Sequence, residues 1–163
     1  MFNNNPQSPR RGSGGPKRQG EFAEAEFLNR AIRLGFAVAQ PWGDSERYDF
    51  VVDAGERFWR VQVKSCNHRA RGQYGYNFKA YSNARYYKRT PYSAAQIDIL
   101  AAYLVPENLW YILPIEILEN RLNFSLFPDN CYARGGNRGL GPIAHIYREA
   151  WWIFSGEGKP ADE

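Results

Sequence analysis

Apolar and polar residues alternate in two short runs of the chain, residues 47–53 and 58–66. A turn containing Gly55 separates the runs, and both are rich in β-branched and aromatic residues, which predicts an antiparallel hairpin. Successive side chains of a strand point to opposite faces, so the second strand has an apolar and a polar face. The apolar face carries Trp59, Val61 and Val63, and the polar face carries Arg60, Gln62 and Lys64.

The register of this hairpin decides which polar residues meet. If the apolar faces of both strands cover one core, Asp49 lies on the same side as Gln62 and Lys64, because a slip of one residue would reverse one strand. An acid opposite an amide and a lysine suits metal-dependent phosphodiester hydrolysis, in which the acid binds Mg²⁺ and the lysine acts on water or phosphate. A polar sheet face turned to solvent alternates in the same way, so spacing alone leaves both interpretations open.

Residues 20–35 have the periodicity of a helix that ends at Gly35. Its predicted apolar stripe consists of Leu28, Ala31 and Ile32. Glu24 falls inside this stripe, and a carboxylate directed toward a core is costly unless it is paired or bound to a metal. Acids are also common in the first turn of a helix because of the helix dipole, but that explanation fits Glu21 better than Glu24.

The remaining apolar runs complete an α/β fold. Further strands are predicted at 36–39, 74–82, 97–105, 109–114 and 122–126, and helices at 115–120 and 143–154. The strands at 36–39 and 74–82 are expected to join the first hairpin in a central mixed sheet flanked by helices. The length of 163 residues suits one domain, which we place at 20–156, between a disordered basic arm (1–19) and a disordered tail (157–163).

Charge is distributed unevenly along the chain. The formal net charge is +4, and the basic arm accounts for all of it. No Asp or Glu lies between Arg57 and Ile97, where Arg and Lys alternate with tyrosines. A merely solvated surface would mix in acids, so the stretch favours contacts with the phosphates of double-stranded DNA. The predicted DNA-binding residues are Arg69, Arg71, Lys79, Arg85, Lys88 and Arg89.

Several other classes of protein are disfavoured. No apolar run is long enough to cross a membrane and the N-terminus is polar, so we expect no membrane association and a cytoplasmic location. Cys66 and Cys131 form neither a zinc pattern nor a disulfide framework.

Four short motifs occur in a characteristic order: Gly20-x-x-x-Glu24, Gly35-Phe36-x-Val38, Tyr48-Asp49 and Gln62-Val63-Lys64. With them the chain resembles the PD-(D/E)XK nuclease superfamily, most closely its small homing-endonuclease-like branch with a Gln-x-Lys motif. Archaeal Holliday-junction resolvases are more distant. The resemblance covers residues 20–118 and implies a restriction-endonuclease-like core that hydrolyses DNA with Mg²⁺, for which Mn²⁺ substitutes.

The resemblance also implies roles for particular residues. Glu24, Asp49, Gln62 and Lys64 would be catalytic, and Glu24, Asp49, Gln62 and the Val63 carbonyl would surround the metal. Tyr48 stands where the name-giving proline would be, and Gln62 replaces an acid, bringing an amide oxygen but no charge. Because cutting a duplex takes two sites, a homodimer or homotetramer is expected. The alternatives are a resolvase-like, structure-selective nuclease and a DNA-binding module with a degenerate site, which Gln62 supports.

Overall fold

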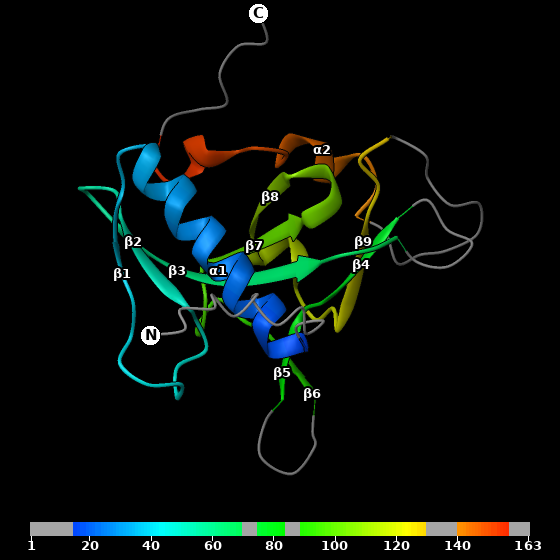
Figure 1. Ribbon diagram of the computed structural model, residues 1–163, viewed down its shortest axis with the longest axis horizontal. Coiled ribbons are helices and arrows are strands. Elements are labelled where there is room, and N and C mark those ends of the chain that lie inside the picture. Colours follow the sequence, from blue (N-terminus) through cyan, green and yellow to red (C-terminus); the bar gives the residue numbers. More distant parts are fainter. Residues whose placement is uncertain (1–14, 70–74, 84–88, 130–139, 157–163) are drawn as a thin grey trace, which may run out of the picture.

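A five-stranded sheet with the order β1–β2–β3–β7–β8 lies at the centre of the computed structural model, which describes residues 15–69, 75–83, 89–129 and 140–156 (Figure 1). The strands are β1 (Ala37–Ala39), β2 (Phe50–Asp53), β3 (Phe58–Cys66), β7 (Ile99–Leu104) and β8 (Leu109–Pro114). β3 and β7 run parallel, whereas the other neighbouring pairs are antiparallel. The sheet is therefore mixed, which confirms the predicted α/β class.

The long helix α1 (Pro16–Arg33) lies across one face of this sheet (Figure 1). It begins four residues before the predicted start, because Pro16 stands in the first turn, where a missing N–H costs nothing. Residues 16–19, predicted as part of the disordered arm, are thus helical. The helix ends as expected before Gly35, which has a φ of 89°. Within the described ranges, no helix is long and apolar enough to span a membrane.

The buried stripe of α1 differs from the predicted one. It consists of Ala23, Phe27 and Ala31, whereas Ile32 is 57% exposed. The cause is Phe27, whose ring packs against Phe50 and against Trp151, which lies far away in the sequence. This tertiary contact sets the rotation of the helix, so Glu24 lies at the edge of the stripe and not within it.

The β2–β3 hairpin has the predicted register. Phe50 pairs with Val61 and Val52 with Trp59, and the apolar side chains of both strands pack toward α1. The opposite face is not turned to solvent, because a second apolar cluster that includes Tyr92 covers it. Gln62, on that opposite face, is only 7% exposed. The interpretation of its polar residues as a solvated sheet face is therefore wrong at this position.

The predicted strand 74–82 does not join the central sheet. It divides into β4 (Tyr76–Lys79), which pairs with β9 (Asn123–Leu126), and β5 (Tyr81–Asn83), which pairs with β6 (Arg89–Pro91). The edge of β3 that it would have used is occupied by β7. The aromatic side chains of β4 instead pack over the face of the central sheet as part of the second apolar cluster.

The C-terminal region also departs from the prediction of one helix at 143–154. It contains only α2 (Ile143–Ile146) and the 3₁₀ turn η3 (Trp151–Ile153). Glu149 between them has a φ of 48°, and its backbone and carboxylate both bond to Trp110 of β8. The free edge of β8 therefore binds a segment whose sequence alone predicts a helix.

The strands predicted at 97–105 and 109–114 are present as β7 and β8. The short 3₁₀ helix η1 (Val105–Glu107) joins these two strands. The predicted helix after β8 is the 3₁₀ helix η2 (Ile115–Leu118), and the predicted strand near 122–126 is β9.

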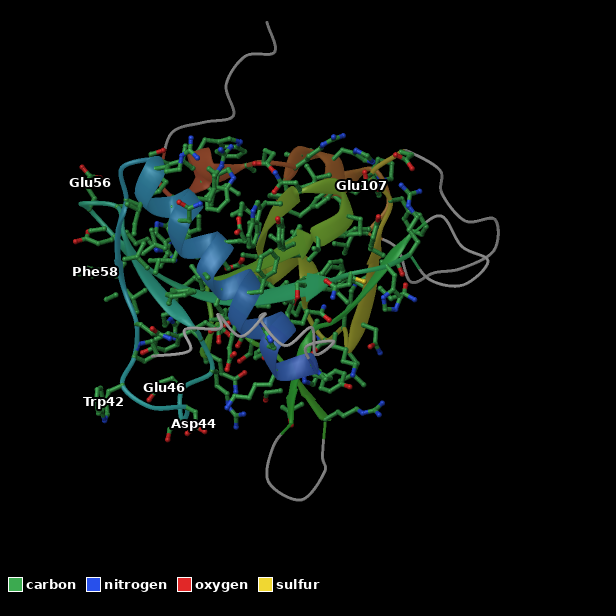
Figure 2. All side chains as sticks on the ribbon, viewed as in Figure 1. Trp42, Asp44, Glu46, Glu56, Phe58 and Glu107 are labelled. Atoms are coloured by element: carbon green, nitrogen blue, oxygen red, sulfur yellow. The ribbon has the colours of Figure 1, made fainter. Side chains whose placement is uncertain are left out.

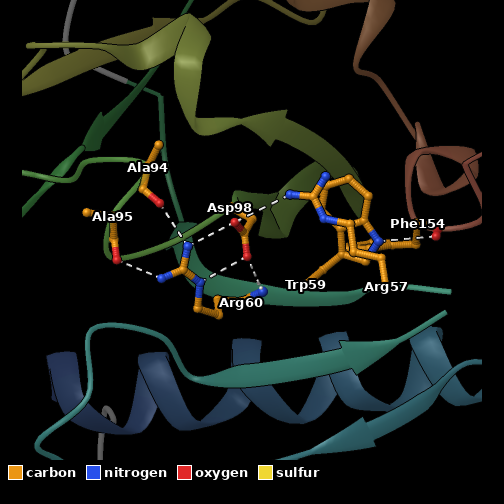
Figure 3. Close-up of polar contacts among 7 residues, drawn as sticks. All are labelled: Arg57, Trp59, Arg60, Ala94, Ala95, Asp98 and Phe154. Carbon is orange, nitrogen blue, oxygen red and sulfur yellow. Dashed lines mark hydrogen bonds and ion pairs between the residues drawn. The ribbon is translucent and has the colours of Figure 1, made fainter. Parts of the chain in front are cut away.

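An ion-pair cluster ties the segment before β7 to β3 (Figure 3). The Arg60 guanidinium donates to both carboxylate oxygens of Asp98, each at 3.0 Å, and to the carbonyls of Ala94 and Ala95. The backbone N–H of Arg60 also donates to Asp98, at 2.8 Å. Asp98 therefore has a structural role, because it joins the start of β7 to β3.

Candidate active site

Asp49 stands immediately before β2, opposite Gln62, as the predicted register requires. Its backbone N–H donates to the Val61 carbonyl at 2.8 Å. Its Oδ2 accepts a hydrogen bond from the Val63 N–H at 2.7 Å and another from Nε2 of Gln62. The carboxylate is thus held on the β3 strand by a backbone donor and a side-chain donor.

The side-chain amide of Gln62 bridges three groups. Besides Asp49, Nε2 lies 3.2 Å from the Val63 carbonyl, and Oε1 accepts a hydrogen bond from the Tyr92 hydroxyl at 3.2 Å. In this orientation the amide nitrogen, and not the oxygen that is expected to ligate a metal, faces Asp49. The reason is chemical, because a carboxylate and a carbonyl are both acceptors and need a donor between them.

Burial and neighbouring charges perturb the titration of the site. Burial raises the pKa of Asp49 to about 6, opposed by the hydrogen bond from Val63 and assisted by the charge of Glu24. Burial lowers the pKa of Lys64, opposed by the charges of Asp49 and Glu24. Glu24, Asp49 and Lys64 therefore belong to one electrostatic unit, although three separate elements or segments supply them.

Glu24 and Asp49 also line one cavity of about 530 Å³. The N-terminal half of α1 forms one wall, and the loop between β1 and β2 forms another. Figure 2 shows Trp42 on this loop, pointing away from the body of the molecule, whereas Asp44 and Glu46 of the same loop line the cavity. The Trp42 side chain is fully exposed. The carboxylates of Glu24 and Asp49 therefore line the same cavity.

The donor atoms at this site fit a hard divalent cation. Among the described residues, no three His, Cys, Asp or Glu side chains gather closely enough to hold a metal by themselves. The site instead offers two carboxylates and the Val63 carbonyl, all of them oxygen ligands of the kind that Mg²⁺ prefers. The pKa of the Asp49 carboxyl, which lies beside a second carboxylate, is raised to about 6 despite the positive charge of Lys64, and a bound cation would offset this cost of burying negative charge.

The structure describes three of the six predicted DNA-binding residues, and these three have different surroundings. Lys79 is exposed on β4, and its charge contributes to the lowered pKa of Lys64. Arg89 is exposed on β6, 5.3 Å from the ring of Tyr81. Arg69 is held at 2.7 Å by Glu107 and by Asp129, so a phosphate would have to compete with two carboxylates. The others, Arg71, Arg85 and Lys88, lie outside the described residues.

Sequence reasoning missed one residue at the site, Tyr92. It follows β6, 28 positions after Lys64 and outside every motif. Its hydroxyl nevertheless contacts Gln62, and its ring centroid lies 5.6 Å from Nζ of Lys64. The richness of this region in tyrosine was visible in the sequence, but it indicates DNA contact as readily as packing beneath a site.

The mixed sheet, the helix across it and the Asp49–Gln62–Lys64 hairpin define a restriction-endonuclease-like nuclease. The PD-(D/E)XK endonuclease family matches residues 15–126, which is more than half of the chain. The chain belongs to this family. It is therefore a nuclease, DNA is the substrate that its family implies, and the enzymes of this family generally use divalent metal ions.

Solved structures give a further comparison. The bacterial homing endonuclease I-Ssp6803I is 26% identical, with a TM-score of 0.71 over 88% of this chain and 95% of that chain. The Holliday junction resolvase Hjc of Archaeoglobus fulgidus is 18% identical, with a TM-score of 0.44 over 68% and 84%. MepB is 16% identical, with a TM-score of 0.49 over 76% and 94%. No curated protein matches the chain. The first similarity confirms the resemblance to the homing-endonuclease branch.

The raised pKa of Asp49 predicts how pH affects the metal-free protein. Its ordinary pKa is 3.8 and its folded value is about 6, so the folded state binds the proton more tightly. The folded state gains its full stabilisation from the protonated Asp49 carboxyl below pH 4 and loses it as the pH rises through 6. Two pKa units correspond to at most about 3 kcal/mol. We expect Asp49→Asn to raise the free energy of unfolding at pH 8 by about 1–2 kcal/mol.

Urea denaturation in a chelator at pH 4 and pH 8 measures this effect. The control is Asp44→Asn on the exposed loop between β1 and β2, which should follow the wild type at both pH values. If Asp49→Asn changes the free energy of unfolding equally at pH 4 and pH 8, the carboxyl does not titrate near 6.

Proposed function

We propose that the chain is a Mg²⁺-dependent DNA endonuclease of the homing-endonuclease-like kind, with Mn²⁺ able to replace Mg²⁺. The observation that carries the proposal is the half-buried Asp49. Its carboxylate has a pKa near 6, faces a cavity shared with Glu24, and is electrostatically coupled to Lys64. Perturbed carboxylates and lysines in a cavity are typical of catalytic sites.

In this proposal each residue of the site has a separate role. Glu24, Asp49 and the Val63 carbonyl would hold the metal, which would supply Lewis-acid chemistry and lower the pKa of the attacking water. Gln62 holds the Asp49 carboxylate and the Val63 carbonyl through its amide nitrogen. Lys64 presents a half-buried ammonium group that orients the attacking water and offsets the negative charge that develops on the phosphate.

DNA binding is proposed to use the basic residues next to the site. Lys79 is suited to a phosphate near the cleaved bond, because its charge acts on Lys64. Arg89 lies on the two-stranded ribbon of β5 and β6, which projects from the body of the molecule (Figure 1). A two-stranded ribbon has dimensions that fit the major groove of DNA. Two copies of the chain, as a dimer or tetramer, would supply one site for each strand of the duplex.

A cleavage assay tests the proposed function. Wild-type protein is incubated with linear duplex, supercoiled plasmid and four-way-junction DNA, each with Mg²⁺ or with a chelator. We expect Mg²⁺-dependent cleavage of duplex DNA. Cleavage of the junction alone would indicate a structure-selective resolvase. Binding without cleavage on any substrate would indicate a module with a degenerate site, which the amide of Gln62 in place of an acid favours.

Salt dependence should reveal how the β5–β6 region contributes to DNA binding. Each phosphate that a basic residue neutralises adds about −0.9 to the log–log slope of affinity against salt concentration. We expect the triple variant Arg85→Ala, Lys88→Ala, Arg89→Ala to make the slope shallower by up to about 2.7, if each of the three residues neutralises one phosphate. Loss of residues that contact only the DNA backbone should weaken binding to all DNA sequences alike. Loss of a residue that reads a base edge should weaken binding mainly to the preferred sequence.

Fluorescence titrations at several salt concentrations, on preferred and random duplexes, measure these slopes. The charge-matched control is Arg30→Ala, Arg33→Ala, Arg148→Ala, whose side chains are exposed away from the catalytic cavity. That control should keep the wild-type slope. Equal slopes for both triple variants and the wild type would exclude the β5–β6 region from the DNA contact.

A further inference from the structure

Tyr92 lies directly against the candidate site and is almost completely buried. It is 5% exposed and belongs to the apolar cluster on the face of the sheet opposite α1. Its backbone N–H donates to the carbonyl of Ala80 at 3.0 Å. The hydroxyl, at the other end of the side chain, reaches Oε1 of Gln62 at 3.2 Å. This buried hydroxyl therefore contacts a residue of the candidate site directly.

The contacts of Gln62 leave only one orientation for its amide. Nε2 faces the Asp49 carboxylate and the Val63 carbonyl, and both of these accept hydrogen bonds. If the amide turned over, its oxygen would face two acceptors and its NH₂ group would face Tyr92. In the observed orientation the oxygen needs a donor, and the only group bonded to it among the described residues is the Tyr92 hydroxyl.

The Tyr92 hydroxyl is suited to remain that donor. Burial raises the pKa of Tyr92 to about 12, with a further contribution from the charge of Asp49. The hydroxyl is therefore protonated throughout the pH range in which nucleases work. Lys64 Nζ lies 5.6 Å from the centroid of the same ring, a distance at which the ammonium is attracted to the aromatic face. One side chain thus contacts two residues of the site.

The segment around Tyr92 is fixed on both sides. At Tyr92 itself, the backbone N–H is held by the hydrogen bond to the Ala80 carbonyl. After it, the Arg60 guanidinium binds the carbonyls of Ala94 and Ala95, at 2.8 and 2.7 Å, as well as Asp98 (Figure 3). Arg60 stands two residues before Gln62 on β3, so the same strand anchors the segment and receives its hydroxyl. Tyr92 has little freedom to move away from Gln62.

We propose that Tyr92 is a positioning residue of the nuclease site: its hydroxyl fixes the Gln62 amide so that Nε2 holds the Asp49 carboxylate and the Val63 carbonyl. The proposal rests on the proposed function. It gives a new role to Gln62, which stands in place of an acid. Gln62 does not replace an acidic ligand atom for atom. It connects Tyr92 to two groups that are themselves suited to ligate the metal.

The test compares Tyr92→Phe with Tyr103→Phe. Tyr103 is also buried, at 3% exposed, and its hydroxyl donates to Asn108 at 2.8 Å, but it packs on the α1 face of the sheet. Both changes remove one hydrogen-bonded hydroxyl and keep the ring. At saturating DNA and Mg²⁺, we expect Tyr92→Phe to lower the single-turnover cleavage rate ~10-fold, the equivalent of one lost hydrogen bond. DNA affinity should stay within about twofold, because the phosphate contacts are intact. Tyr103→Phe should cleave at the wild-type rate.

A double-mutant cycle shows whether Tyr92 acts through Gln62. In a Gln62→Ala background, Tyr92→Phe should cause no further loss of rate, because the amide that it orients is gone. A second ~10-fold loss in that background, or an unchanged rate in the single variant, would overturn the proposal.

The metal-free protein gives a second readout that does not depend on activity. Side-chain amide signals of ¹⁵N-labelled protein are compared, and the Gln62 signal is identified by its absence in Gln62→Ala. We expect the Gln62 signal to move in Tyr92→Phe and to stay in place in Tyr103→Phe. An unmoved signal in Tyr92→Phe contradicts the positioning role. Lack of cleavage by the wild type would contradict the proposed function instead, and the amide signals would still decide whether Tyr92 orients Gln62.

Discussion

Lys64→Ala and Asp49→Ala should each lower the rate of DNA cleavage by at least about 1,000-fold, the scale on which removal of a transition-state charge or metal ligand acts. Lys64 provides positive charge beside Asp49 and Glu24, and its alanine variant leaves both carboxylates without it. Asp49 is the carboxylate on which the hydrogen bonds of Val63 and Gln62 converge. DNA affinity should change little, because the wider contact surface is not altered.

Single-turnover cleavage and DNA binding in Ca²⁺ measure the two effects separately. The matched controls are Asp53→Ala, at the other end of β2, and Arg30→Ala, an exposed cation near the C-terminal end of α1. Both controls should cleave within about threefold of the wild type, since surface charges remote from a site contribute little. Wild-type rates in Asp49→Ala and Lys64→Ala would remove this hairpin as the catalytic site.

Phe27→Ala should lower the free energy of unfolding by about 4 kcal/mol, as expected for truncation of a fully buried aromatic side chain. Phe27 is 0% exposed. Its ring lies 5.4 to 6.4 Å, between centroids, from four other aromatic rings: those of Phe50, Trp110, Trp151 and Phe154. The loss of the ring leaves a cavity between α1 and the sheet that the rigid neighbours cannot fill. Since α1 also carries Glu24, the variant should bind Mg²⁺ more weakly where it still folds.

Urea denaturation at neutral pH measures the loss, and Phe22→Ala is the control. Phe22 lies on the same helix but is 47% exposed, so its truncation should cost less than about 1 kcal/mol. Similar losses for the two variants would show that α1 does not pack on the sheet through Phe27.

The amino-acid sequence by itself determined the hairpin that carries the site. An alternating strand must present its apolar residues to a core, and this requirement fixes the register that sets Asp49 opposite Gln62. The continuous apolar runs of β7 and β8 likewise required burial on both faces. These features depend on residues that are close together in the chain, and a local pattern is enough to predict them.

Only the tertiary structure decided which distant residues meet. The rotation of α1 depends on the contact of Phe27 with Trp151, and the C-terminal segment follows the edge of β8 instead of forming a helix. The orientation of the Gln62 amide depends on Tyr92, a residue 30 positions away that no motif includes. Alternation determines the face on which a side chain lies, but not the partner opposite it. That partner depends on packing among elements brought together by folding.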